Sequence, residues 1–328
     1  MFRVGLNPYG IAYSVGLFGA DSTRPNPHPL GLNGFLDLAD SIGAAGVEIP
    51  VALLKSVSDA DVNRVCARLH EKGKYAILMH GISWSDLDGS LAVAERFGFP
   101  LIRLHMTAIL CGDRSKLGAD WPRVIASART QLKSFAHKAA GLGLDVTIED
   151  HQDLTSAELL EICAECGPNV GICFDTGNPL SVGEDPLHFA RAVAPLVRHL
   201  HLKDYRIFWT ADGYRLARCP IGEGAIPFQK IAKILEPLGA LPASIEPGAL
   251  SERHIRLLND SWWEHYPRRD ARDLAACIKF ARAESEPEGA EWRTPWEREC
   301  DAETVVLYEI DELAHSVANL KELGLMQD

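Results

Sequence analysis

Four residues able to bind a metal ion, Glu149, Asp175, His201 and Glu246, stand at the ends of four short apolar segments. If these segments are parallel strands of one closed sheet, their carboxyl ends meet at one rim, where barrel enzymes have their active sites. Three carboxylates buried together repel one another unless a cation compensates their charge. Oxygen-rich ligands with one imidazole favour a single divalent ion, Mn or Mg, with Co and Zn as alternatives.

The elements that would position these residues recur along most of the chain. Amphipathic helical patterns, with apolar residues three and four apart, separate the apolar segments and indicate helices packed on a sheet. The fold class predicted is therefore α/β, a (β/α)8 TIM barrel, because no GxGxxG motif opens the first helix of an open doubly wound sheet. The predicted strands are residues 2–7, 46–50, 75–80, 101–105, 145–149, 170–175, 197–202 and 243–246.

Two segments exceed a minimal barrel. Residues 8–31 are rich in Gly and Pro but contain aromatic residues, which predicts a long loop or lid on the functional rim. Residues 261–328 contain helical patterns near 271–283 and 302–323. We therefore expect a barrel domain over residues 1–260 and a C-terminal helical extension over residues 261–328, packed on the barrel or on an oligomer partner.

Composition excludes several classes of protein. The chain has 328 residues, of which 47% are hydrophobic and 24% charged, a balance typical of a globular protein. The formal net charge of −12 argues against binding to nucleic acid or to an anionic membrane surface. No apolar run is long enough to span a bilayer, and the N-terminal residues lack the pattern of a signal peptide. We expect a cytoplasmic protein.

Four stretches of the sequence resemble the sugar phosphate isomerase/epimerase family, which is the xylose-isomerase-like TIM barrel superfamily. They are residues 146–151 (VTIEDH), 171–178 (GICFDTGN), 199–204 (HLHLKD) and 218–224 (RCPIGEG). The resemblance covers roughly residues 1–250. It implies one Mn or Mg ion held by Glu149, Asp175, His201 and Glu246. It also implies a small-molecule carbohydrate substrate and a homo-oligomer, either a dimer or a tetramer.

The sequence departs from the family at Asn178, where many members have a histidine three residues after the aspartate ligand. An asparagine side chain can hydrogen-bond a substrate hydroxyl but is a poor metal ligand. The DNA-repair endonucleases of the superfamily need that histidine and a later Asp-x-His for a three-zinc cluster, and this chain lacks both. The departure and the negative charge exclude the nuclease activity.

The predicted site suits reactions that pass through an enediolate. A divalent ion that chelates a carbonyl and an adjacent hydroxyl stabilises the enediolate formed when the intervening C–H bond is broken. Glu149 and Glu246 are the predicted catalytic residues, one removing the proton and the other returning it to the opposite face. The leading hypothesis is an isomerase or epimerase acting on a keto sugar or sugar acid, without a phosphate group.

Two other hypotheses stay open. A lyase of the same superfamily would form the enediolate by decarboxylating a 3-oxo sugar acid, or would eliminate a group from a 3-keto glycoside. A non-catalytic scaffold would only bind sugar. The predicted substrate-binding residues are polar groups near the strand ends, some of them assigned by the resemblance: Glu48, Arg103, His105, His151, Asn178, Lys203 and Arg218. For Lys203, an ion pair with Asp204 is the alternative to contact with a substrate oxyanion.

Overall fold

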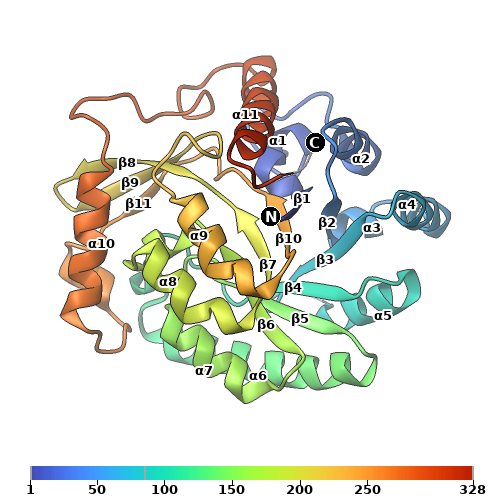
Figure 1. Ribbon diagram of the computed structural model, residues 1–328, viewed down its shortest axis with the longest axis horizontal. Helices are drawn as coiled ribbons and strands as arrows, with labels where there is room; N and C mark the ends of the chain where they lie inside the picture. Colours follow the sequence, from blue (N-terminus) through green and yellow to red (C-terminus); the bar gives the residue numbers. More distant parts are fainter. Residues whose placement is uncertain (1, 85, 327–328) are drawn as a thin grey trace.

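Eight parallel strands form a closed barrel, so the predicted fold class is confirmed (Figure 1). A computed structural model describes residues 2–84 and 86–326 of the chain. The barrel closes because β1 is hydrogen-bonded to both β2 and β10. The strands are β1 (Arg3–Leu6), β2 (Gly46–Pro50), β3 (Tyr75–Gly81), β4 (Leu101–His105), β5 (Asp145–Glu149), β6 (Val170–Asp175), β7 (Val197–Leu202) and β10 (Pro242–Ile245).

The strand sequences are almost continuously apolar because helices cover the outside of the barrel and side chains fill the inside. Every residue of β2, β4 and β6 is buried. Since side chains alternate along a strand, Cys173 and Asp175 share one face of β6, and His199 and His201 share one face of β7. The second residue of each pair lies nearer the carboxyl end, so the polar groups gather at the rim.

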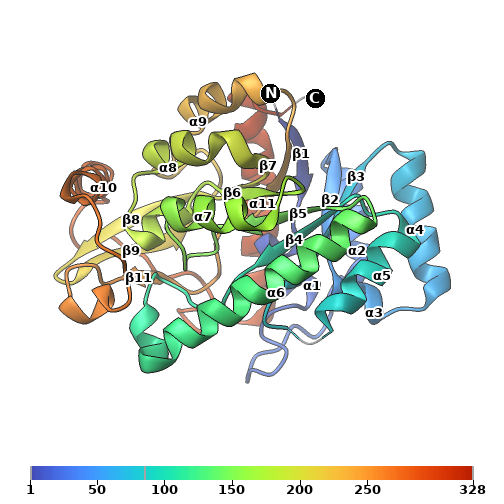
Figure 2. The same ribbon diagram turned by 90° about the horizontal axis from the view of Figure 1, so that it is seen from below.

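Helices follow the strands and lie around the barrel, as Figure 2 shows from the side. Capping boxes begin two of them, at Ser58 with Asp61 and at Thr155 with Glu158. The helices are α1 (Ala12–Val15), α2 (Gly31–Ser41), α3 (Val51–Lys55), α4 (Asp59–Glu71), α5 (Leu87–Phe97), α6 (Trp121–Gly141), α7 (Ser156–Cys166), α8 (Pro186–Val193) and α9 (Phe228–Leu235). Short 3-10 turns join them: η1 (Pro8–Ile11), η2 (Arg114–Asp120), η3 (Asn178–Val182), η4 (Ala194–Leu196), η5 (Glu236–Leu238) and η6 (Asp260–Trp263).

A small antiparallel sheet, which the sequence analysis does not predict, stands beside the barrel. It has the order β11–β9–β8 and consists of β8 (Tyr205–Thr210), β9 (Gly213–Arg218) and β11 (Arg253–Ile255). The hairpin of β8 and β9 directly follows β7, and β11 returns to it after β10. The sheet therefore extends the rim at which the predicted metal ligands lie.

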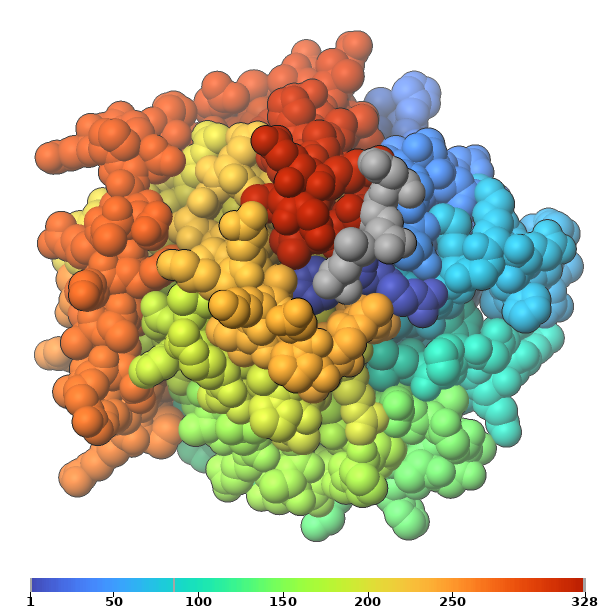
Figure 3. All heavy atoms as spheres, in the orientation of Figure 1, coloured from blue at the N-terminus to red at the C-terminus, as the bar shows by residue number. Residues whose placement is uncertain are grey.

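The predicted C-terminal helical extension is present and packs on the barrel. It contains α10 (Ala271–Ala283), beside the small sheet, and α11 (Ala302–Glu322). Glu309 of α11 accepts hydrogen bonds from the N–H and the hydroxyl of Ser14, both at 2.7 Å. The N–H of Phe2 donates to the carbonyl of Leu325, and Figure 3 shows the C-terminal segment in red against the N-terminal residues in dark blue. The division into two domains at residue 260 stays a prediction.

Within residues 2–84 and 86–326, every helix is too short or too polar to cross a membrane.

Candidate metal and substrate site

The four predicted metal ligands meet at the carboxyl end of the barrel. Glu149 ends β5, Asp175 ends β6, His201 lies in β7 and Glu246 directly follows β10. Each offers one ligand atom, and these atoms all lie within 4.8 Å of one another. All four residues are buried, so the barrel brings together side chains that are far apart in the sequence.

The His201 ring is oriented so that one nitrogen faces the carboxylates. Its Nε2 lies 2.8 Å from Oε2 of Glu48, whose carboxylate can only accept, so Nε2 carries the proton. Its Nδ1 lies 2.9 Å from Glu246, 3.4 Å from Glu149 and 3.9 Å from Asp175, but with no hydrogen bond among the described residues. A buried nitrogen that converges with three carboxylates on one point without bonding any of them fits a divalent cation.

Arg103, from β4, holds two carboxylates of the site. Its Nε donates to Glu48 at 2.6 Å and its Nη1 donates to Glu149 at 2.7 Å, and the guanidinium is buried with both partners. Because charge-assisted hydrogen bonds are short and directional, Arg103 fixes the carboxylate of Glu149 at the rim.

Lys203 contacts the other two carboxylates. Its ammonium donates to Asp175 and lies 3.0 Å from Oε1 of Glu246. The Asp204 carboxylate instead accepts backbone N–H groups from Tyr205 and from residues 222, 224 and 226. The Lys203 side chain therefore points into the site, whereas Asp204 holds the loop after β9.

The charges of the site leave room for a doubly positive ion. Four carboxylates, those of the three acidic ligands and Glu48, face two cations, Arg103 and Lys203, so the net charge is about −2 with His201 neutral. Burial by itself lowers the pKa of His201, but Cys173 and the carboxylates of Glu246 and Glu48 outweigh burial and raise that pKa. The surroundings thus favour a positive charge at Nδ1, and protons compete with metal ions for such a nitrogen.

The ionisation of two further groups bears on their chemistry. Burial raises the pKa of Glu246, but Lys203 and His201 outweigh it and hold that pKa at about 2. Burial and the neighbouring His151 lower the pKa of His105 to about 3. Near neutral pH, Glu246 is therefore a carboxylate able to accept a proton, and His105 is a neutral imidazole.

Asn7, which the sequence analysis does not single out, holds Glu246 in place. It follows β1, and its amide nitrogen donates to Glu246 at 2.6 Å and to Glu48 at 3.1 Å. Its amide oxygen accepts the N–H of Tyr9 at 2.9 Å. The available signal was its position as a polar residue ending the first predicted strand, which is the same signal that identified the metal ligands.

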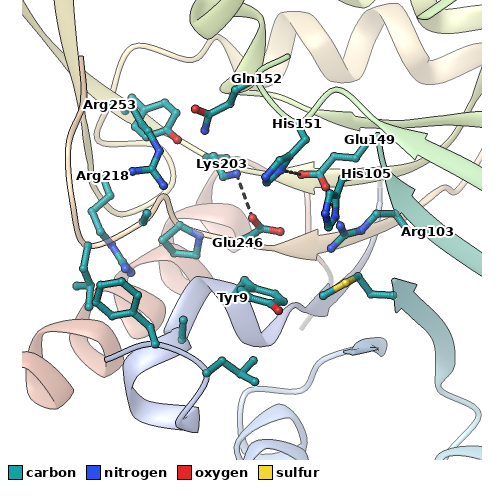
Figure 4. A pocket seen from close by; sticks show the side chains of 18 of the residues that line it. Tyr9, Arg103, His105, Glu149, His151, Gln152, Lys203, Arg218, Glu246 and Arg253 are labelled. Carbon is teal, nitrogen blue, oxygen red and sulfur yellow. Dashed lines mark hydrogen bonds and ion pairs between the residues drawn. The ribbon is translucent and has the colours of Figure 1, made fainter. Parts of the chain in front are cut away.

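A cavity of about 240 Å³ opens above the cluster and is lined by Glu149 and Glu246. It is of a size for one monosaccharide, smaller than the pockets that hold drug-sized ligands. Five of the predicted substrate-binding residues also line it: Arg103, His105, His151, Lys203 and Arg218 (Figure 4). Their substrate-binding roles stay predictions.

Two predicted substrate-binding residues lie off this cavity. Glu48 is fully buried behind the ligands and contacts His201, Arg103 and Asn7. Asn178 begins η3 and is also buried, and its amide atoms have no hydrogen-bond partner in the described part of the chain. Neither residue lines the cavity, so their predicted contacts with substrate stay predictions that this cavity does not support.

Arg218 is fully occupied by other parts of the chain, although it lines the cavity. Its Nε donates to Glu312 of α11 at 2.6 Å, its Nη2 donates to the carbonyl of Gly10 at 2.8 Å, and its Nη1 lies 3.6 Å from Glu309. The side chain is 1% exposed. Arg218 therefore ties the C-terminal helix and the loop after β1 to the rim.

Other cavity-lining residues escape the sequence analysis, among them Tyr9, Gln152, Tyr205 and Arg253. Tyr9 belongs to the segment expected to form a loop on the functional rim. Tyr205 and Arg253 belong to the small sheet, which the sequence analysis does not predict. No sequence signal marks Gln152, which lies three residues beyond the predicted ligand Glu149.

Several curated proteins are similar in sequence, among them one from Escherichia coli and one from Pectobacterium atrosepticum. Uncharacterized protein YihM of Escherichia coli is 30% identical over 163 residues, which cover 47% of this chain and only 45% of the E. coli protein. The 3-oxo-isoapionate decarboxylase of Pectobacterium atrosepticum is 24% identical over 273 residues, which cover 80% of this chain and 92% of the decarboxylase.

The fold is similar to that of solved sugar epimerases. A D-psicose 3-epimerase crystallised in the presence of D-fructose has a TM-score of 0.59 and 16% sequence identity, over 97% of this chain and 99% of the epimerase. At that identity, the likeness shows the fold alone. The sequence model described as "Xylose isomerase-like TIM barrel" matches residues 36–261, more than half of the chain. The closed barrel, the four converging candidate ligands and this match lead to one conclusion: the chain belongs to the xylose isomerase-like TIM barrel family.

Proposed function

We propose that the protein is a divalent-metal-dependent isomerase or epimerase that acts on a keto sugar or a sugar acid through an enediolate. The observation that carries the proposal is the convergence of Glu149, Asp175, His201 and Glu246, with ligand atoms within 4.8 Å, beneath a monosaccharide-sized cavity. When bound by these four residues, a divalent ion supplies Lewis acidity toward a carbonyl oxygen and an adjacent hydroxyl oxygen of the substrate.

The two glutamates carry the proton transfers in this proposal. One carboxylate takes the proton from the carbon next to the carbonyl, and the electron pair of that C–H bond moves into the enediolate. The other glutamate, protonated, gives a proton to the opposite face of the same carbon, which inverts its configuration. The pKa values of Glu149 and Glu246 are both lowered, so either carboxylate can accept the proton near neutral pH, and the glutamate that acts as donor takes up its proton from solvent. Such general bases contribute about 10²- to 10⁴-fold to rate.

The remaining side chains orient and compensate charge. Arg103 holds Glu149, and Asn7 and Lys203 hold Glu246, so neither glutamate has to reorganise during proton transfer. Lys203 also lines the cavity, where its ammonium can donate a hydrogen bond to the oxygen on which negative charge develops. Neutral His105 can donate to or accept from a substrate hydroxyl.

A lyase reaction is the second candidate, favoured by the similarity to a 3-oxo-isoapionate decarboxylase along most of both chains. In that reaction, the C–C bond to the carboxylate carbon breaks and carbon dioxide leaves. The electron pair of the broken bond forms the same kind of enediolate, which is then protonated on carbon. The same four ligands serve either reaction, so the reaction products have to distinguish them.

The test is turnover of a panel of ketoses and 3-oxo sugar acids in D2O, followed by NMR, with Mn²⁺ and then with a chelator. An isomerase or epimerase incorporates deuterium at the carbon next to the carbonyl, whereas a decarboxylase releases carbon dioxide. The Glu246→Gln variant should fold as the wild type but lose turnover. Turnover that persists without metal refutes the proposal, and undiminished turnover by Glu246→Gln refutes the role of that residue.

A further inference from the structure

The cations that line the cavity differ in whether a carboxylate compensates them. Arg103 pairs with two glutamates, Lys203 with Asp175 and Glu246, and Arg218 with Glu312. Arg253, which lines the same cavity, forms no ion pair with any described residue. A guanidinium is always charged at physiological pH, so Arg253 contributes a positive charge to the cavity that no carboxylate of the described residues compensates.

The hydrogen bonds of Arg253 are also incomplete. Its Nη1 donates to the carbonyls of Ser251 at 3.2 Å and Glu252 at 3.4 Å, which anchor one edge of the guanidinium. Its Nε is buried and has no acceptor among the described residues, and the same is true of the Tyr205 hydroxyl. Buried donors without partners are costly, so two of them lining one cavity indicate an acceptor that the protein itself does not supply.

The register of the small sheet places these donors on one face. Tyr205 of β8 is paired with Arg218 of β9, and Arg253 of β11 is paired with Leu216, two residues before Arg218. Directly paired residues, and residues two apart on one strand, point to the same side of a sheet. Tyr205, Arg218 and Arg253 therefore share the face that borders the cavity.

Two glycines hold the Tyr205 ring in position. A Cβ atom at Gly248 would lie 2.5 Å from the ring, and one at Gly177 would lie 2.8 Å from it. The backbone therefore clamps the phenol from both sides, and its hydroxyl keeps a fixed place beside the cavity. Burial raises the pKa of Tyr205 to about 12, so the hydroxyl keeps its proton and remains a donor.

Gln152 adds an amide to the lining of the same cavity (Figure 4). Its backbone has a φ of +87°, in the left-handed region that side-chain-bearing residues seldom adopt. Its amide oxygen accepts the N–H of Cys111 at 3.0 Å, whereas the amide nitrogen of this cavity-lining side chain has no hydrogen-bond partner among the residues that the structure describes. Strained residues of this kind gather at ligand sites.

We propose that Arg253, Tyr205 and Gln152 form a subsite for the carboxylate of a sugar acid. A carboxylate has two oxygens that only accept hydrogen bonds, which match the guanidinium, hydroxyl and amide donors. It is favoured over a phosphate ester because a single unpaired guanidinium faces the ligand, while Glu246 and Glu309 also line the cavity. The subsite lies in the same cavity as the four metal ligands, so one substrate can reach both.

This inference rests on the proposed function in naming a sugar substrate, but it is tested by binding alone. Isothermal titration calorimetry compares D-gluconate with D-glucitol, which has the same carbon chain without charge, and with D-glucitol 6-phosphate. Titrations run with Mn²⁺ and with a chelator, because gluconate also binds metal ions. The proteins are the wild type, Arg253→Met, Tyr205→Phe and the control Arg256→Met, which removes an exposed arginine nearby.

We expect gluconate to bind the wild type more tightly than glucitol does, with and without metal. Arg253→Met should weaken gluconate binding about 10- to 100-fold and Tyr205→Phe up to about 10-fold, since bonds to charged groups are the strong ones. Glucitol binding and the control should stay within about twofold of the wild type. Tyr205→Phe removes one oxygen atom and keeps the test valid if Arg253→Met does not fold.

Gluconate binding that is equal in Arg253→Met and wild type overturns the subsite, as does Arg253-dependent preference for the phosphate ester. The proposed function fails by a different result, namely sugar turnover that needs no metal. A protein that binds gluconate through Arg253 but turns over nothing would refute that function and retain the subsite.

Discussion

Replacing Glu48 by Gln should weaken metal binding although Glu48 is not itself a ligand. Burial raises the pKa of Glu48, but Arg103 and His201 outweigh it and hold that pKa at about 2, so the side chain is ionised at neutral pH. Its carboxylate accepts from Nε2 of His201 at 2.8 Å, Nε of Arg103 at 2.6 Å and the amide of Asn7 at 3.1 Å. A glutamine side chain at this position would offer one acceptor oxygen to these three donors.

The magnitude follows from what the substitution removes. The amide NH2 of a glutamine is a donor and would face another donor, either the His201 N–H or the Arg103 guanidinium. His201 can avoid this donor–donor contact by carrying its proton on Nδ1, which is the nitrogen that faces the candidate metal ligands. The net charge of the site also changes from about −2 to about −1. Loss of such supporting contacts costs about 10- to 100-fold in metal affinity, or about 1.4 to 2.7 kcal/mol. We expect the upper half of this range.

The assay is isothermal titration calorimetry of the metal-stripped protein with Mn²⁺ at pH 7. Asp40→Asn is the matched control, because Asp40 is also a carboxylate bonded to several cations, those of Arg68, Lys72 and Lys74, but lies away from the cavity. Urea unfolding of both variants without metal reports any loss of fold. Equal Mn²⁺ affinity in Glu48→Gln and wild type would refute the orientation argument for His201.

Two further predictions concern stability. The Glu312→Ala substitution leaves the Arg218 guanidinium, which is 1% exposed, without its partner at 2.6 Å, and should lower the free energy of unfolding by about 3 kcal/mol. Urea unfolding measures this loss. A loss below about 1 kcal/mol would count against a structural role of the ion pair. Burial raises the pKa of Asp153 to about 6 from about 4 in the unfolded chain, so the folded state binds this proton more tightly. Its stabilising contribution, up to about 3 kcal/mol, is complete below about pH 4 and is lost as pH rises through about 6. The Asp153→Asn variant should therefore show a smaller fall in the free energy of unfolding between pH 4 and 7 than the wild type. Parallel pH profiles of the two proteins would contradict this prediction.

The fold was predictable because its signals are local. Each barrel strand is a short apolar run that ends in polar residues, and the predicted strands at 46–50, 101–105, 145–149, 170–175 and 197–202 have the observed bounds. The helical pattern at 271–283 likewise matches α10. The small sheet of β8, β9 and β11 was not predicted, because its strands interrupt a β/α unit instead of repeating it.

The site was predictable in part for the same reason. The topology of a parallel barrel sends the end of every strand to one rim, so residue type and strand position sufficed to bring together Glu149, Asp175, His201 and Glu246. Asn7 stands at an equivalent strand end and would have followed from that rule. Gln152 lies in a connecting segment and Arg253 begins the three-residue strand β11, and neither stretch is long enough to show a periodicity that places a side chain.

By itself, the sequence determined the barrel and the convergence of the four candidate metal ligands, since hydrophobic periodicity and strand ends are properties of short stretches of chain. Only the tertiary structure decided which charges neutralise one another. It paired Arg218 with α11, turned Glu48 toward His201 and left Arg253 without a carboxylate partner among the described residues. Ion pairing depends on distances of a few ångströms between distant segments, and those distances exist only after the chain has packed.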